Sequence, residues 1–172
     1  MHIAKRLLGR AAQTSAAVPV SAAPIGDQPA TPPPVGAAQF GLGRLLLVED
    51  NFVNERVAVY MLAKLGHPVD VARHGREAID MLSKSVYALV LMDCQMPEMD
   101  GFEATRIIRD RASAVLDHEV PVVAMTANTS PEDRARAFAA GMNDFLAKPV
   151  DRSVLADMLE KWRNRPHGRS GP

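Results

Sequence analysis

The stretch Leu89-Val90-Leu91-Met92-Asp93 is an apolar run that ends on a carboxylate. An earlier apolar run, Leu45-Leu46-Leu47-Val48, ends in the same way on the acidic pair Glu49 and Asp50. Short, continuously apolar runs are typical of parallel strands that are buried on both faces of a sheet. In an open parallel α/β sheet, ligands bind outside the carboxyl ends of the strands, where the strand order reverses. The three acids are therefore predicted to share one site.

Three carboxylates in one site indicate a metal ion. Carboxylates that are held close together repel one another, which costs free energy unless a cation lies between them. Mg²⁺ in proteins is usually held by one or two carboxylates, several waters and the oxygens of a phosphate. The sequence therefore predicts a Mg²⁺ and phosphate site at Glu49, Asp50 and Asp93.

Two further predicted strands end on groups that suit a phosphate. Val122-Val123-Ala124-Met125 leads to Thr126, and Phe145-Leu146-Ala147 leads to Lys148, just before Pro149. A lysine supplies a compact positive charge to a phosphoryl oxygen, and a threonine hydroxyl can donate a hydrogen bond to another. All of these polar side chains are expected at one edge of the sheet.

From Arg44 onward, short apolar runs alternate with helical patterns, which is typical of repeated βα units. The predicted strands are Leu45 to Val48, Pro68 to Ala72, Tyr87 to Met92, Val122 to Met125 and Asp144 to Leu146. The first helix, which ends at Gly66, is predicted to carry one apolar stripe. That stripe consists of Val53, Val57, Met61 and Leu65.

Capping residues predict where two later helices begin. Ser130 supplies a capping hydroxyl and Pro131 suits the first helical position, so the fourth helix is expected to start there. Asp151 is expected to cap the last helix, on which Trp162 is assigned to the core rather than to a ligand site.

Composition favours a soluble globular protein. The 172 residues are 47% apolar and include 20 acidic and 20 basic residues, so no bulk charge attracts nucleic acid or a membrane surface. The single cysteine, Cys94, excludes a disulfide framework within one chain and agrees with a reducing compartment. The sequence shows no secretory signal and no apolar run long enough to span a bilayer. A cytoplasmic location is predicted, without direct nucleic-acid or membrane partners.

The chain divides into a folded part and two tails. Residues 1–43 are rich in Ala and Pro and are predicted to be a disordered tail or linker. A short docking helix that contains Ile3, Leu7 and Leu8 is a less favoured alternative. Residues 44–164 form the predicted folded domain, residues 165–172 are predicted to be flexible, and no second folded domain is expected.

Four motifs follow one another in a specific order. They are Leu-Val-Glu-Asp-Asn ending at Asn51, Leu-Met-Asp-Cys-Gln-Met-Pro-Glu-Met-Asp-Gly ending at Gly101, Ala-Met-Thr-Ala-Asn ending at Asn128, and Phe-Leu-Ala-Lys-Pro ending at Pro149. On these motifs the chain resembles the response-regulator receiver domain, the phosphoacceptor module of two-component and phosphorelay signalling. The resemblance covers about Arg44 to Trp162.

The resemblance implies a flavodoxin-like (βα)5 fold with five parallel strands in the order 2-1-3-4-5. It also implies a signalling domain rather than an enzyme, in which Asp93 accepts a phosphoryl group from a phosphohistidine. Lys148 and Thr126 would contact the phosphoryl oxygens. The implied Mg²⁺ ligands are Asp50, Asp93, the backbone carbonyl of Gln95 and, through water, Glu49.

The resemblance further implies a conformational switch and a class of partner. Thr126 would move toward the phosphate, and Phe145, three positions before Lys148, would turn inward; many relatives carry tyrosine there. The output face would run from Ser130 to Trp162. The expected partner is a sensor histidine kinase or a histidine phosphotransfer protein, and a homodimer is also compatible with the sequence.

The residues also bear on three other functions. A phosphatase of the haloacid-dehalogenase type requires the motif Asp-x-Asp. The second acid is missing here, since the sequence reads Asp93-Cys94-Gln95. The pattern from Asp50-Asn51 to Asn54 resembles receivers of hybrid sensor histidine kinases, so the chain could be a fragment of one. A phosphorylation-independent interaction module would be natural only if the site had lost residues. Cys94 as a redox thiol is disfavoured because it has no partner cysteine.

Overall fold

Five parallel strands form one sheet in the order β2-β1-β3-β4-β5. This computed structural model describes residues 42–164. The strands are β1 (Leu45–Val48), β2 (Val69–Ala72), β3 (Leu89–Asp93), β4 (Val122–Thr126) and β5 (Asp144–Ala147). The helices are α1 (Phe52–Lys64), α2 (Gly75–Leu82), α3 (Gly101–Arg109), α4 (Pro131–Ala139) and α5 (Arg152–Arg163). The predicted fold and strand order are confirmed; β1 has the predicted bounds, and the ends of the other strands differ from the prediction by at most two residues.

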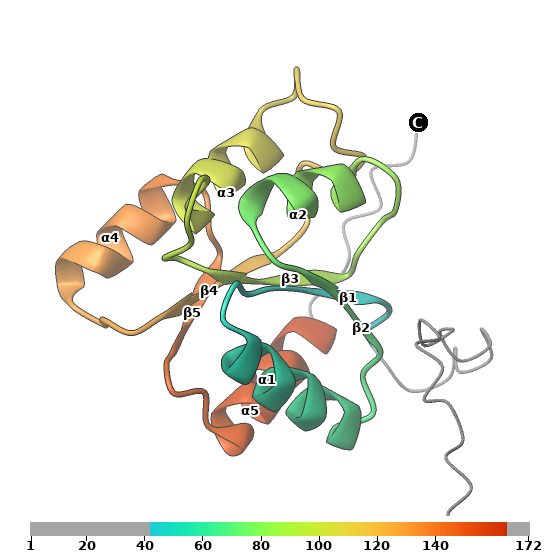
Figure 1. Cartoon of the computed structure of the whole chain (residues 1–172), viewed down its shortest axis with the longest axis vertical. Coiled ribbons are helices and arrows are strands. Elements are labelled where there is room, and N and C mark those ends of the chain that lie inside the picture. The colour runs from blue at the N-terminus through green and yellow to red at the C-terminus, as the bar shows by residue number, and fades with distance from the viewer. Residues whose placement is uncertain (1–41, 165–172) are drawn as a thin grey trace, which may run out of the picture. The chain divides into compact units, whose positions relative to one another are not determined.

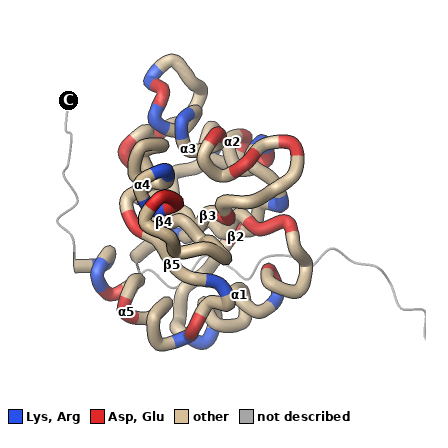
Figure 2. The backbone as a smooth tube through the Cα atoms, turned by 90° about the vertical axis from the view of Figure 1, so that its left-hand side faces the viewer, with Lys and Arg blue, Asp and Glu red and all other residues tan. Residues whose placement is uncertain are grey.

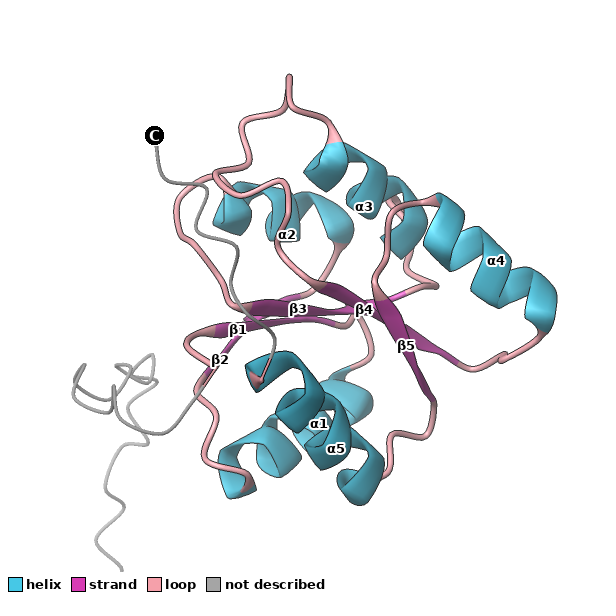
Figure 3. Cartoon of the chain, turned by 180° about the vertical axis from the view of Figure 1, so that it is seen from behind, coloured by secondary structure: helices cyan, strands magenta, loops and turns pink. Residues whose placement is uncertain are grey.

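Helices cover both faces of the sheet. Helices α1 and α5 lie on one face, and α2 and α3 lie on the other, with α4 beside β5 (Figures 1 and 3). Alternate residues of a strand point to opposite faces. Accordingly, Leu45 and Leu47 of β1 pack in the cluster with α1 and α5, whereas Leu46 and Val48 pack in the cluster with α2 and α3. Continuously apolar strands are needed because both faces are covered.

The register of the sheet brings the ends of β1 and β3 level. Val48, the last residue of β1, pairs with Met92, so Glu49 and Asp93 both follow the same rung of the ladder. The strand order reverses between these two strands, since β2 lies outside β1 and β4 lies beyond β3. The acids therefore stand at the point where ligands bind in such sheets.

The apolar stripe predicted for α1 is only half right. Met61 is buried, but the side chains of Val53 and Val57 are 66% and 50% exposed, and the helix instead buries Glu55, Ala58, Met61 and Leu62. An α-helix has 3.6 residues per turn, so residues spaced by four drift around the axis by about 40° at each step. A strict repeat of four therefore leaves the buried face.

The predicted helix termini are confirmed. The Ser130 hydroxyl accepts from the amide of Asp133 ahead of Pro131, and Asp151 caps α5. Gly66 follows the end of α1 with a φ of +80°, and Trp162 is buried. Of the predicted N-terminal tail only Leu42 and Gly43 are described; Leu42 is buried against α1 and α5 rather than exposed. The rest of that tail and residues 165–172 lie outside the described residues.

Charges of both signs are interspersed along the domain (Figure 2), in keeping with the equal numbers of acidic and basic residues in the chain. Across residues 42–164, none of the helices is long and apolar enough to cross a lipid bilayer.

Candidate functional site

The three predicted acids meet at the ends of β1 and β3. One carboxylate oxygen from each of Glu49, Asp50 and Asp93 lies within 4.8 Å of the other two. Glu49 and Asp93 are 2% and 5% exposed, whereas Asp50 faces solvent. Two buried carboxylates and one accessible carboxylate at this separation are a donor set that suits a hard divalent cation.

Lys148 reaches the acids from the end of β5, which is an edge strand of the sheet. Its Nζ atom donates to Asp93 Oδ2 at 2.6 Å and to Glu49 Oε2 at 2.5 Å. The residue follows β5, whose last residue pairs with Thr126 of β4. A lysine in this position is only 17% exposed and places one positive charge between two buried carboxylates.

Burial and charge act in opposite directions on this cluster. Burial raises the pKa of Asp93 above the usual aspartate range, although hydrogen bonds from Lys148 and the Gln95 amide oppose that rise. Burial alone would lower the pKa of Lys148, but its hydrogen bonds to Asp93 and Glu49 outweigh burial and raise it. The lysine therefore stays protonated, yet one ammonium cannot neutralise two buried carboxylates and Asp50. The remaining negative charge favours a further cation.

The loop between β3 and α3 holds the Asp93 carboxylate in place. The Gln95 amide donates to Asp93 Oδ1 at 3.0 Å, and the Asp100 side chain caps α3 by accepting from the amide of Glu103. The predicted Gln95 carbonyl ligand remains a prediction. The positive φ in this loop belongs to Glu98 and not to Gly101.

Gly101 is required for a steric reason. It is the first residue of α3, and a Cβ atom built on it would lie 2.1 Å from the carbonyl oxygen of Asp93 and 2.9 Å from Met92 Cγ. Real Cβ atoms do not come that close to a backbone oxygen. The start of α3 thus packs directly on the backbone of Asp93.

The structure does not bring the two predicted switch residues onto the acids. The Thr126 hydroxyl donates to the Asn128 carbonyl at 2.8 Å and accepts from the Asn128 amide at 3.1 Å, so it is engaged with its own loop. Phe145 is half-buried, with the guanidinium of Arg134 4.0 Å from its ring centroid.

Sequence reasoning missed one residue of the site. The Asn54 side chain donates from Nδ2 to Glu49 Oε1 at 3.0 Å, so both oxygens of this buried carboxylate are held, one by Asn54 and one by Lys148. Asn54 lies in the first turn of α1, where its backbone N–H donates to the side chain of the capping residue Asn51. Its place one turn beyond Asp50 was the available signal, since that turn must face the end of β1.

Cys94 behaves as a structural residue. It is 3% exposed, and burial followed by the charge of Asp93 raises the pKa of its thiol to about 12. A thiol in that state is almost wholly protonated at neutral pH, and the thiolate is the reactive form. The redox alternative for Cys94 therefore gains no support from the site.

Comparison with known proteins identifies the family. The sequence matches the family model described as response regulator receiver domain over residues 45–160. The chain belongs to this family, which is the receiver domain of histidine kinases and phosphorelay proteins.

Curated relatives are much longer proteins. Hybrid signal transduction histidine kinase B of Dictyostelium discoideum is 45% identical over 130 residues, which cover 70% of this chain and 7% of that protein. Histidine kinase 5 of Arabidopsis thaliana is 38% identical over 142 residues, which cover 69% of this chain and 15% of that protein. The chain therefore spans only a small part of the curated relatives that it matches.

Two solved structures are similar in both fold and sequence. The receiver domain of a sensor histidine kinase of Pseudomonas aeruginosa, with a magnesium ion coordinated in its active-site cleft, has a TM-score of 0.65 and 41% identity, covering 72% of this chain and 98% of that one. A chain from the complex of the Saccharomyces cerevisiae histidine phosphotransfer protein Ypd1 with the Ssk1 receiver domain has a TM-score of 0.65 and 32% identity. The match covers 72% of this chain and 90% of that one.

Proposed function

We propose that this domain accepts a phosphoryl group from a phosphohistidine onto Asp93 in a Mg²⁺-dependent reaction, and that the modification changes its surface for a partner or for onward transfer. The observation that carries the proposal is the contact of Lys148 Nζ with both Asp93 and Glu49 inside the acidic cluster. Related receiver structures that contain a magnesium ion, or that come from a complex with a phosphotransfer protein, support it.

The chemistry follows from the groups present. A carboxylate oxygen of Asp93 forms a bond to phosphorus while the bond from phosphorus to the histidine nitrogen breaks. The imidazole keeps that electron pair and takes up a proton, and the product is an aspartyl phosphate. An ionised carboxylate is already a nucleophile, so the site needs no general base. The protein contributes positioning and positive charge, and Lys148 supplies charge to the phosphoryl oxygens.

The acidic cluster fits Mg²⁺ because one oxygen from each of its three carboxylates lies within 4.8 Å of the other two, close enough for an ion and its waters to bridge them. Asp50 and Asp93 would bind the ion directly, with Glu49 acting through water and the Gln95 carbonyl as a further ligand. Bound there, the ion would neutralise charge on the phosphoryl oxygens and on the acids. Reaction in the cytoplasm, and a signalling rather than enzymatic role, are part of this proposal.

Asn54 is expected to support Mg²⁺ binding through Glu49. If Lys148 moves to the phosphoryl group, the Asn54 amide is the described partner that still holds Glu49 in place. We expect Asn54→Ala to weaken Mg²⁺ binding about tenfold, the low end for losing a group that orients a metal-site residue. Isothermal titration calorimetry measures this directly.

A matched control exists at the other end of the fold. Asn164, which caps the end of α5, also donates from its side chain to a glutamate, Glu160, at 3.2 Å. Asn164→Ala should leave Mg²⁺ affinity unchanged. Equal affinities for the Asn54→Ala and wild-type proteins would show that Glu49 is held without this asparagine.

The switch is proposed to involve Thr126 and Phe145. For Thr126 to bind a phosphoryl oxygen, its hydroxyl must leave the Asn128 carbonyl that it contacts in this structure. Phe145 could then occupy the space released beside β4, which neighbours β5 in the sheet. Movement of these two residues would alter the surface around α4.

The exposed apolar side of α1 is the proposed docking surface for the phosphohistidine donor. This α1 patch consists of Phe52, Val53, Val57 and Tyr60, which are 50% to 66% exposed. It begins two residues after Asp50, so a protein seated on it would lie at the mouth of the acidic site. Arg56 and Lys64 stand 5.5 Å from the Phe52 and Tyr60 rings and add positive charge. A helical phosphotransfer protein with an apolar, acidic surface fits this combination.

We expect Val57→Ser to slow phosphotransfer from a histidine phosphotransfer protein about fivefold, since one apolar interface contact is lost. Labelling by a small phosphodonor should not change. Val86→Ser is the control, because Val86 is 63% exposed but precedes β3, at the opposite edge of the sheet. If both variants accept phosphate from the protein donor at the wild-type rate, the donor docks elsewhere.

Intact-mass analysis tests the function. Wild-type protein is incubated with acetyl phosphate, and in parallel with a phosphorylated histidine phosphotransfer protein, each with Mg²⁺ and with a chelator. A single phosphoryl adduct that requires Mg²⁺ supports the proposal. The absence of an adduct with either donor, in folded protein that binds Mg²⁺, would overturn it and favour the phosphorylation-independent interaction module.

The relatives favour one biological setting. They are histidine kinases, one of them named as a hybrid kinase, in which the match to this chain occupies a small part of the protein. We propose that this receiver works in a phosphorelay of that type, either as a separate protein or as part of a hybrid kinase.

A further inference from the structure

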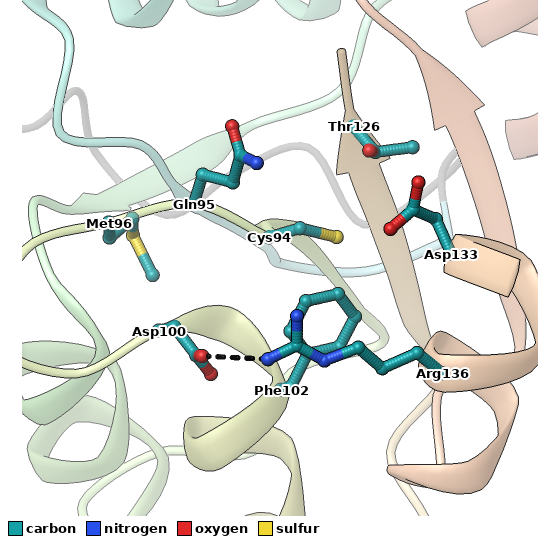
Figure 4. A pocket seen from close by; sticks show the side chains of 8 residues that line it. All are labelled: Cys94, Gln95, Met96, Asp100, Phe102, Thr126, Asp133 and Arg136. Atoms are coloured by element: carbon teal, nitrogen blue, oxygen red, sulfur yellow. Dashed lines mark hydrogen bonds and ion pairs between the residues drawn. The ribbon is translucent and has the colours of Figure 1, made fainter. Parts of the chain in front are cut away.

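Helix α4 is weakly anchored in the core. Of its residues Pro131–Ala139 only Ala137 is buried, whereas α3 buries Gly101, Phe102, Ala104, Thr105 and Ile108. Beside α4 lies a pocket of about 410 Å³, bordered by the loop after β3 and by Thr126 at the end of β4 (Figure 4). Apolar packing therefore contributes little to holding this helix, and other contacts must define its position.

One such contact is made by Arg136. Its guanidinium carbon lies 4.2 Å from the Phe102 ring centroid, and its Nη2 atom donates to Asp100 Oδ2 at 3.4 Å. Figure 4 shows the side chain reaching from α4 across the pocket to these two residues. Asp100 and Phe102 flank Gly101, which packs on the backbone of Asp93. Arg136 thus ties α4 to the loop that carries the phosphoacceptor.

The second contact is made by Arg134. Its guanidinium carbon lies 4.0 Å from the centroid of the Phe145 ring, and Phe145 precedes Lys148 by three residues in β5. Arginine is attracted to the face of an aromatic ring, so this contact favours the position of the ring seen here. Inward rotation of the ring would move it away from the position that this contact favours.

We propose that Arg134 and Arg136 are positioning residues that hold α4 in its unphosphorylated position, and thereby set how readily the phosphorylated conformation forms. This inference rests on the proposed function and deepens it. Thr126 is joined to α4 by the short loop that ends at the cap Ser130. Movement of Thr126 toward a phosphoryl group would pull on the start of α4, while inward rotation of Phe145 would separate it from Arg134.

The size of the effect follows from the equilibrium between the two conformations. A contact that stabilises one conformation slows a reaction that requires the other conformation. The rate falls by the factor by which the contact shifts the equilibrium between the two. An exposed contact between arginine and an aromatic ring corresponds to a factor of about two to five. The two arginines contact different rings, so the effects of removing them should multiply.

The test compares Arg134→Gln, Arg136→Gln and the double variant. The first readout is the initial rate of phosphorylation by acetyl phosphate at saturating Mg²⁺, and the second is amide hydrogen exchange of α4 without any phosphodonor. We expect each single variant to be phosphorylated two to five times faster, with faster exchange in α4. Arg134→Lys should lie between Arg134→Gln and wild type, because lysine keeps the charge but not the planar stack.

Arg106→Gln controls for the loss of one positive charge. Arg106 is exposed on α3 and lies outside both ring contacts. It should match wild type in both readouts. Unchanged exchange of α4 in the double variant would overturn the inference, and so would slower phosphorylation of the two single variants than of Arg106→Gln. Failure of the wild-type protein to form any adduct would instead count against the proposed function, and the exchange experiment would still test the two contacts.

Discussion

Replacing Asp93 with asparagine should abolish the phosphoryl adduct. The amide is isosteric with the carboxylate but has no negative charge, so it is not a nucleophile toward phosphorus. We expect the variant to fold, since Lys148 can still pair with Glu49 and the substitution removes one of three mutually repelling acids. Intact-mass analysis after incubation with acetyl phosphate and Mg²⁺ is the measurement, with thermal unfolding as the check on folding.

Asp100→Asn is the matched control for that experiment. Asp100 lies in the loop between β3 and α3 and caps α3, and asparagine caps helices as well as aspartate does. It is outside the cluster of Glu49, Asp50 and Asp93. The Asp100→Asn protein should still take up one phosphoryl group. Equal labelling of the Asp93→Asn and wild-type proteins would place the acceptor at another residue.

Gly101→Ala should be the most destabilising single methyl addition near the site. The added Cβ would lie 2.1 Å from the Asp93 carbonyl oxygen, and a backbone atom cannot swing away as a side chain can. We expect a loss of about 3 kcal/mol in the free energy of unfolding, after the better helix propensity of alanine is taken into account. For a domain of this size that corresponds to a fall in Tm of about 10 °C.

Gly66→Ala separates steric from conformational cost. Gly66 has a φ of +80°, but a Cβ atom there would meet nothing within 4 Å. Its substitution should cost only about 1 kcal/mol, the penalty of a left-handed conformation for alanine. Urea denaturation of both variants measures the two values. A Gly101→Ala protein as stable as wild type would mean that α3 can shift away from Asp93 at little cost.

Much of the fold was predictable because its signals are local. Continuous apolar runs indicated buried parallel strands, and Ser130-Pro131 and Asp151 indicated helix starts that the structure confirms. The apolar stripe of α1 was misjudged, since a repeat of four approximates the helical period but drifts away from it over three steps. Exposed Val53 and Val57 became interpretable only once the buried face of α1 was known.

The sequence by itself determined which chemical groups stand at the ends of the strands, and so the acids, the lysine and the family. Only the tertiary structure decided which of those groups touch. Lys148 is 99 residues from Glu49 in the chain, yet their side chains meet because β1 and β3 end level and β5 lies two strands beyond β3 in the same sheet. The contact of Arg134 in α4 with the Phe145 ring in β5 likewise depends on packing between separate elements. Sequence patterns report local backbone preference and burial, whereas side-chain partners are chosen by the whole fold.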